Sequence, residues 1–252
     1  IAQPQRRQPE QRGGPRRDEG VEQQRALQLS QLDIGAADAV EVISRGLRVL
    51  RPIEVSTAIP DLESKVNVQG GMDAKQLPFN LLAQQIVNEY GQFAIATPEE
   101  AMSAAGLWKQ LDMINWYMNR GYEVQAVLLT KEWLTSICGC WLGVNPKKLL
   151  KYGSRLEIEN ALFEPFNTEV RNGKPVVISP KYHPIADIPL RDVIVYLVQA
   201  LKAGEGIRND IAHAGMREKP KQANEIIQLA QEICEPTRLE EIATALLGPR
   251  PE

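Results

Sequence analysis

The apolar residues of this chain recur mostly at steps of three and four positions, the spacing that places them on one face of an α-helix. The first run ends before Pro52, because proline cannot continue a helix. Similar runs, separated by glycine or proline, follow as far as the C-terminal residues. They predict helices over residues 33–51, 73–90, 97–120, 122–142, 147–163 and 190–203, and further helices from 207, from 221 and from 237.

The two longest predicted helices are separated by little more than Gly121. A break this short turns the chain back on itself, so the two helices are expected to form an antiparallel pair. Residues 53–72 differ from both, because they contain Pro60 and two adjacent glycines. They are expected to form a connection without regular structure.

Two capping boxes predict where particular helices begin. Thr97 can cap the first helix of the antiparallel pair, with Pro98 at its first position and Glu100 completing the box. Thr237 and Glu240 form the same pattern and are expected to start the last helix.

One short segment has the pattern of β-structure. Residues 168–170 and 175–178 are rich in Thr, Val and Ile, and Asn172-Gly173 lies between them as a turn signal. The predicted fold class is therefore all-α, a helical bundle with a small β-hairpin insertion.

The domain organisation follows from a change in composition along the chain. Residues 1–25 are rich in Arg, Gln and Pro and almost free of apolar side chains, so they are expected to be a disordered tail. Residues 26–72 are expected to hold one helix and a linker, and residues 73–252 a helical domain. A chain of 252 residues is long enough for a real hydrophobic core.

Composition and charge exclude several classes of function. A net charge of −3 gives no overall basic field, so any contact with nucleic acid must be a local patch. No apolar run is long enough to predict a membrane span. The three cysteines are Cys138, Cys140 and Cys234, an odd number that fits a reducing, cytoplasmic environment. Cys138 and Cys140 point to different sides of a helix, so no metal site is expected.

Four aromatic residues fall on the antiparallel helix pair: Trp108, Trp116, Tyr117 and Trp133. Aromatic rings of this kind can stack on RNA bases. Their helical spacing among leucines and isoleucines favours packing in the core instead.

The stretch from Ile207 to Met216 concentrates the chemistry of the chain. It contains Arg208, Asn209 and His213, and the only other histidine, His183, lies in a predicted loop as a surface or packing residue. On a helix, Asn209, His213 and Arg217 share a face, whereas Arg208 and His213 lie about 140° apart. One copy supplies a single imidazole, but RNA cleavage needs a base and an acid. Two copies related by a two-fold axis would supply both.

Arg208 to His213 resembles the R-x4-6-H motif of the HEPN ribonucleases. The resemblance implies a HEPN-like helical fold and a metal-independent endoribonuclease that cleaves single-stranded RNA at a homodimer interface. Arg208 would hold the scissile phosphate, His213 would transfer protons and Asn209 would orient one of them. Arg217 would contact the RNA, and no metal or other cofactor is implied.

The wider helical region, from Asn115-Trp116-Tyr117 through Glu132-Trp133-Leu134, is similar to the HEPN portion of CRISPR type III accessory effectors. This similarity implies a role in antiviral defence, with cyclic oligoadenylate as an allosteric activator bound by a separate sensor domain. Residues 1–72 lack the alternating strands and helices of such a sensor, which is therefore expected to be absent or truncated.

Other interpretations of the same residues remain open. Arg208 can bond to a nearby carboxylate and His213 to a backbone carbonyl, as a purely structural pair. Asp210 can help catalysis, although an exposed aspartate that favours the helix dipole is the simpler expectation. The helix pair also resembles tetratricopeptide-type scaffolds, and a catalytically inactive HEPN module would only dimerise or bind RNA.

Overall fold

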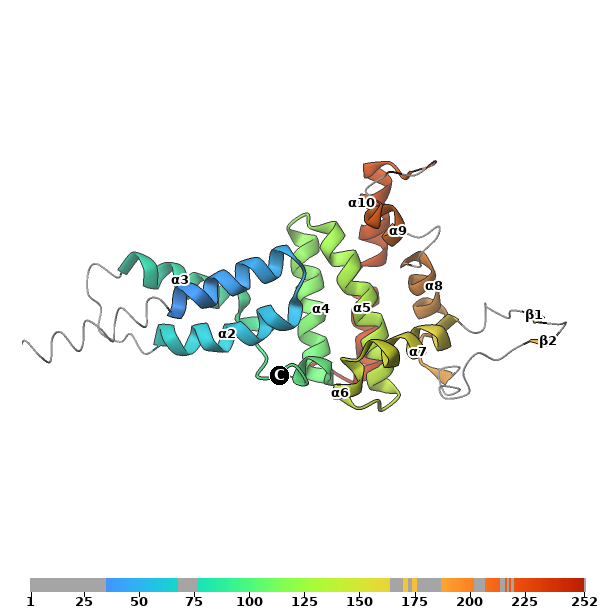
Figure 1. Ribbon diagram of the computed structural model, residues 1–252, viewed down its shortest axis with the longest axis horizontal. Helices are drawn as coiled ribbons and strands as arrows, with labels where there is room; N and C mark the ends of the chain where they lie inside the picture. The colour runs from blue at the N-terminus through green and yellow to red at the C-terminus, as the bar shows by residue number, and fades with distance from the viewer. Residues whose placement is uncertain are drawn as a thin grey trace, which may run out of the picture.

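The computed structural model describes residues 35–67, 77–163, 170–171, 174–175, 187–201, 207–213, 216, 218 and 220–251. Helices make up most of these residues, which confirms the all-α prediction (Figure 1). Two short strands, β1 (Val170–Arg171) and β2 (Lys174–Pro175), pair antiparallel. The residues around them and the predicted Asn172-Gly173 turn lie outside the described residues, so the β-hairpin insertion stays a prediction.

The first helix of the described residues spans residues 35–48. The labelled elements follow it along the chain. These are α2 (Pro52–Asn67), α3 (Leu77–Tyr90), the 3₁₀ turns η1 (Gly91–Phe93) and η2 (Glu100–Met102), α4 (Ala104–Asn119), α5 (Glu123–Trp141), α6 (Pro146–Leu149), α7 (Tyr152–Phe163), α8 (Arg191–Leu201), α9 (Ile207–Ala212), α10 (Ala223–Ile233) and α11 (Pro236–Leu247).

Helix α5 is the centre of the bundle. It packs against α4 and against each of α6 to α11, and most of its residues are buried. Figure 1 shows α4 and α5 in the middle, with the helix over 35–48, α2 and α3 on one side and α8, α9 and α10 on the other. The hydrophobic core runs through both sides, from Ala36 to Leu246.

The antiparallel pairing of α4 and α5 is confirmed, and Gly121 makes it possible. Its φ of +70° lies in the left-handed region that favours glycine. The N–H of Gly121 donates to the Met118 carbonyl at 3.1 Å, and the N–H of Tyr122 donates to the Tyr117 carbonyl at 2.9 Å. These two bonds satisfy two of the last carbonyls of α4 where the chain reverses.

The connection predicted over 53–72 is wrong, because α2 occupies most of it and contains Pro60 within the helix. Proline has no N–H and leaves the carbonyl four residues earlier without its helical donor. That carbonyl belongs to Ser56, and the N–H of Ile95 donates to it at 3.1 Å. A residue distant in sequence therefore supplies the hydrogen bond that Pro60 removes.

Both predicted helix starts are displaced. Thr97 does accept the N–H of Glu100 at 3.2 Å, but this box precedes the turn η2. Helix α4 begins after Ser103, whose hydroxyl accepts the N–H of Gly106 at 3.1 Å. In α11 the capping side chain is Glu235, not Thr237, and it accepts the backbone N–H groups of residues 237 and 238.

The core interpretation of the aromatic residues is confirmed. Trp108, Trp116, Tyr117 and Trp133 are all buried, and the indole N–H of Trp133 donates to the Leu107 carbonyl at 2.9 Å. Cys138 and Cys234 are buried free thiols, and burial raises the pKa of Cys138 to about 12 and that of Cys234 to about 11. Within the described ranges, no helix combines the length and apolar character needed to cross a bilayer.

Candidate functional site

Helix α9 carries the stretch that the sequence singles out, and it packs on α5, α8 and α10. Ile207 is 1% exposed and Asp210 is 5% exposed, so these residues, one turn apart, face the protein interior. Arg208 is half-buried, and His213 is exposed just beyond the last residue of α9. The helix thus buries one side and leaves the guanidinium and imidazole groups at or near the surface.

The expectation of an exposed Asp210 is wrong. The carboxylate lies on the buried side of α9, where its spacing of three residues from Ile207 places it. Asp210 also takes part in an interaction within the fold, so it is not an unpaired buried charge.

The shared helical face predicted for Asn209, His213 and Arg217 stays a prediction. Helix α9 ends at Ala212, and the N–H of Met216 donates to the His213 carbonyl at 2.8 Å. A bond to the third residue back has the 3₁₀ pattern, which is frequent at the ends of α-helices. The side chain of Asn209 and all of Arg217 lie outside the described residues, so their proposed roles stay predictions.

The alternative interpretation, in which Arg208 bonds to a carboxylate and His213 to a backbone carbonyl, finds no support among the described residues. Within the part of the chain that the structure describes, no carboxylate pairs with the Arg208 guanidinium and no carbonyl accepts from the His213 imidazole. Both groups are therefore available to a ligand as far as the described residues are concerned. A guanidinium fork matches two phosphate oxygens, and an imidazole can exchange protons near neutral pH.

Exposed apolar side chains lie on the elements around α9. Met216 follows it and is 87% exposed, while Tyr196 on α8 and Ile227 on α10 are also exposed. The Tyr196 hydroxyl donates to Glu232 of α10, and this hydrogen bond raises the pKa of Tyr196. Helices α8 and α10 are thereby linked at the surface beside α9.

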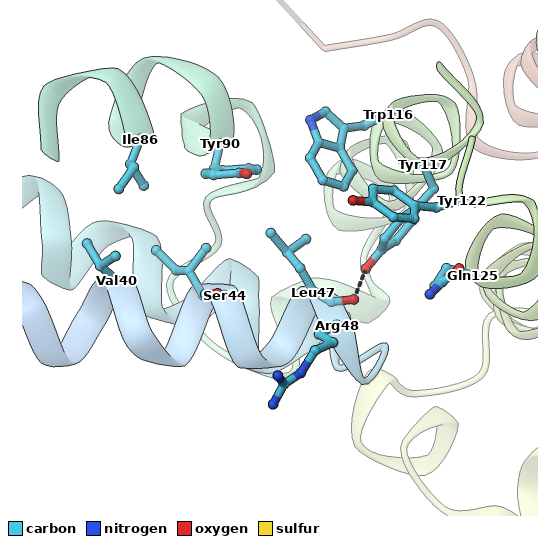
Figure 2. A pocket seen from close by; sticks show the side chains of 11 residues that line it. Val40, Ser44, Leu47, Arg48, Ile86, Tyr90, Trp116, Tyr117, Tyr122 and Gln125 are labelled. Atoms are coloured by element: carbon cyan, nitrogen blue, oxygen red, sulfur yellow. Dashed lines mark hydrogen bonds between the residues drawn. The ribbon is translucent and has the colours of Figure 1, made fainter. Parts of the chain in front are cut away.

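A second candidate site is a cavity between the helix over 35–48, α3 and the turn that joins α4 to α5 (Figure 2). Its volume is about 450 Å³. No lining residue comes from α9, so this cavity is separate from Arg208 and His213. The lining residues are Val40, Ile43, Ser44, Leu47, Arg48, Ile86, Tyr90, Trp116, Tyr117, Tyr122 and Gln125.

Hydrogen bonds hold the aromatic end of this cavity in place. The Tyr117 hydroxyl donates to the Leu47 carbonyl at 2.9 Å, and burial raises the pKa of Tyr117 to about 12. The indole N–H of Trp116 donates to Glu89 at 2.7 Å. The Arg120 guanidinium lies 4.3 Å from the Trp116 ring centre and pairs with the same carboxylate. Trp116 is therefore held by two residues outside the lining, Glu89 and Arg120, and Tyr117 by the backbone of Leu47, which lines the cavity.

Sequence reasoning missed this cavity, because it favoured core packing over base stacking for Trp116 and Tyr117 and did not place a pocket beside them. Both are buried, yet each also forms part of the cavity wall together with Tyr90 and Tyr122. The available signal was the density of aromatic residues on both sides of the Gly121 turn. The contribution of α3 to the wall depends on tertiary packing that no local pattern reports.

A charged cluster between α5 and α7 is structural in character. Arg155 donates to the Glu132 carboxylate at 2.7 Å, to the Ser136 hydroxyl at 2.8 Å and to the Leu149 carbonyl at 3.3 Å. Burial alone would raise the pKa of Glu132, but the adjacent Arg155 and Lys131 lower it overall. Both terminal nitrogens of the guanidinium are thus bonded within the fold.

The described residues contain no group of three metal-ligating side chains. Comparisons with protein-family models, curated proteins and solved structures give no match to the chain.

Proposed function

We propose that the chain is a metal-independent endoribonuclease that cleaves single-stranded RNA at a site shared by two copies. The observation that supports this most is the division of α9 into two sides. Ile207 and Asp210 fix the helix to the core, while Arg208 and the exposed His213 carry groups suited to a phosphodiester. The resemblance of Arg208–His213 to the HEPN motif gives those groups their roles.

In the proposed reaction the 2′-hydroxyl of the RNA is the nucleophile. One imidazole accepts its proton as the bond from O2′ to phosphorus forms, and a second imidazole donates a proton to O5′ as the bond from phosphorus to O5′ breaks. The products are a 2′,3′-cyclic phosphate and a free 5′-hydroxyl. No metal or external co-reactant is needed for this balance.

Arg208 would hold the phosphate during this step. Its planar guanidinium can bond to two non-bridging oxygens at once and neutralise the charge that gathers on them. Asn209 would orient the 2′-hydroxyl or the leaving oxygen, and Arg217 would contact the strand beyond the cleaved bond.

A second copy of the chain would complete the site, because a base and an acid are both needed and the described residues include one histidine, His213. Tyr196 of α8, Ile227 of α10 and Met216 after α9 are exposed apolar side chains and would contribute to the contact between two copies. A two-fold axis there would place two imidazoles and two guanidiniums around one strand.

The wider resemblance supports a role in CRISPR type III antiviral defence in the cytoplasm, with cyclic oligoadenylate as activator through a separate sensor domain. A tetratricopeptide-type scaffold receives less support from the packing. In such arrays each helix pair contacts only its neighbours, whereas α5 contacts helices from α4 to α11.

The test is cleavage of a labelled single-stranded RNA in EDTA by the wild type, by His213→Ala and by His183→Ala. The wild type and His183→Ala should cleave, and His213→Ala should lose roughly 10²–10⁴-fold in rate, the usual worth of acid–base catalysis. His183→Ala is the matched control because it removes the other histidine. Cleavage that persists in His213→Ala, or that requires Mg²⁺, contradicts the proposal.

A further inference from the structure

The cavity shown in Figure 2 has the size of a site for one small molecule. At about 450 Å³ it falls in the range of ligand pockets, roughly 300–1,000 Å³. We infer that it binds a single nucleobase, carried either by a free nucleoside or by an unpaired position of an RNA strand. This inference is independent of the proposed catalysis at α9.

The aromatic end of the cavity provides flat surfaces for a planar ring. Tyr122 is 48% exposed and stacks on Trp116 with 6.2 Å between ring centres and 23° between planes. Tyr90 meets the same Trp116 edge-on, at 5.5 Å and 62°. Figure 2 shows Trp116, Tyr117 and Tyr122 gathered at one end of the cavity. An entering ring can therefore stack on a surface whose orientation is already fixed, which reduces the entropy lost on binding.

Hydrogen-bonding groups lie beside these rings. Gln125 is partly buried and lines the cavity next to Tyr117 and Tyr122 (Figure 2). No described residue hydrogen-bonds to its amide. A glutamine amide presents a donor and an acceptor side by side, and this pair matches the donor and acceptor edge of a base. Ser44 and Tyr90 add hydroxyl groups to the lining.

The charge of the lining also favours a neutral ring inside the cavity. None of the described lining residues is acidic, and the one basic residue is Arg48. Figure 2 shows the Arg48 side chain pointing away from the aromatic rings. The remaining walls are aliphatic, from Val40, Ile43 and Ile86 among others. A planar, uncharged ring with a polar edge satisfies both the aliphatic walls and the Gln125 amide.

The test is calorimetric titration of the full chain with adenosine, guanosine, cytidine and uridine, with ribose as the ring-free control. At least one nucleoside should bind saturably at one site per chain and quench tryptophan fluorescence through Trp116. Tyr122→Ala and Gln125→Ala should each weaken binding at least tenfold, about 1.4 kcal/mol. Tyr152→Ala is the matched control, because Tyr152 is 79% exposed on α7 and lines none of the described cavities.

Circular dichroism of each variant separates lost binding from lost structure, and Gln125→Ala removes no aromatic packing. Saturable binding of no nucleoside, equal binding of ribose, or affinity unchanged in both variants overturns the inference. A single-stranded oligonucleotide that displaces the nucleoside identifies RNA as the source of the base, and failure to displace it identifies a free ligand. His213→Ala should bind nucleosides like the wild type, so the failure of either proposal leaves the other intact.

Discussion

The hydroxyl of Tyr117 donates to the backbone carbonyl of Leu47 across 2.9 Å, and this bond joins the helix over 35–48 to α4 (Figure 2). Both groups are buried. Tyr117→Phe removes the donor and leaves the carbonyl with a weaker partner, the N–H of Leu50 at 3.5 Å. We expect the free energy of unfolding in urea to fall by about 1 kcal/mol. Tyr152→Phe, at an exposed position, should leave it unchanged.

The same residue predicts a dependence of stability on pH. Burial raises the pKa of Tyr117 from 10.0 to about 12, so the unfolded chain loses this proton at lower pH than the folded chain. The contribution of the protonated Tyr117 hydroxyl to the free energy of unfolding is fully present below pH 10 and is lost as pH rises towards 12. The stability gap between wild type and Tyr117→Phe should therefore close over that interval, whereas the buried thiols are common to both proteins. A gap that stays constant contradicts the burial argument.

Gly46 packs closely against Val55, so the stability change caused by Gly46→Ala should depend on the side chain at position 55. A Cβ at Gly46 would lie 2.6 Å from Cγ2 of Val55. Gly46→Ala alone should destabilise the protein by at least about 1 kcal/mol, because the overpacking exceeds the helix propensity gained. In a Val55→Ala background the space is open, and Gly46→Ala should be neutral or stabilising. Chemical denaturation of all four proteins measures the coupling, and simple additivity would show that the contact is relieved without cost.

Some features of the fold could be predicted from the local sequence, and others depend on contacts between distant residues. The helices α4 and α5 follow from their apolar spacing and from Gly121, because both signals are local. Helix α2 does not, since the N–H that compensates for Pro60 comes from Ile95, far along the chain. The buried position of Asp210 likewise depends on how α9 packs, not on its place in the first turn. Exposure of His213 and the aromatic cavity became visible only in three dimensions.

Assembly into a dimer should depend on the surface around α9. Light scattering should give a dimer for the wild type and a monomer for Met216→Glu, because a charge cannot be buried unpaired at an apolar contact. Met216 is 87% exposed, so this substitution should not unfold the chain. Tyr152→Glu, at a similarly exposed site on α7, should remain a dimer. A wild-type monomer that cleaves RNA would rule out the shared site.

Arg208→Lys tests whether geometry or charge alone matters at the phosphate. Lysine keeps the positive charge but not the planar fork, so the cleavage rate should fall roughly 10²-fold. Arg45→Lys is the control, because Arg45 is exposed and pairs with Glu41 on its own helix. Full activity of Arg208→Lys would reduce Arg208 to a generic cation.

The most direct measurement is the chemistry of the RNA ends formed in EDTA, using a single-stranded RNA and the same RNA with 2′-deoxy nucleotides at the cleaved positions. Attack by the 2′-oxygen under His213 and Arg208 predicts 2′,3′-cyclic phosphate and 5′-hydroxyl ends from the first RNA. It predicts no cleavage at the deoxy positions of the second. Products with 3′-hydroxyl ends, or cleavage that continues at the deoxy positions, would contradict it.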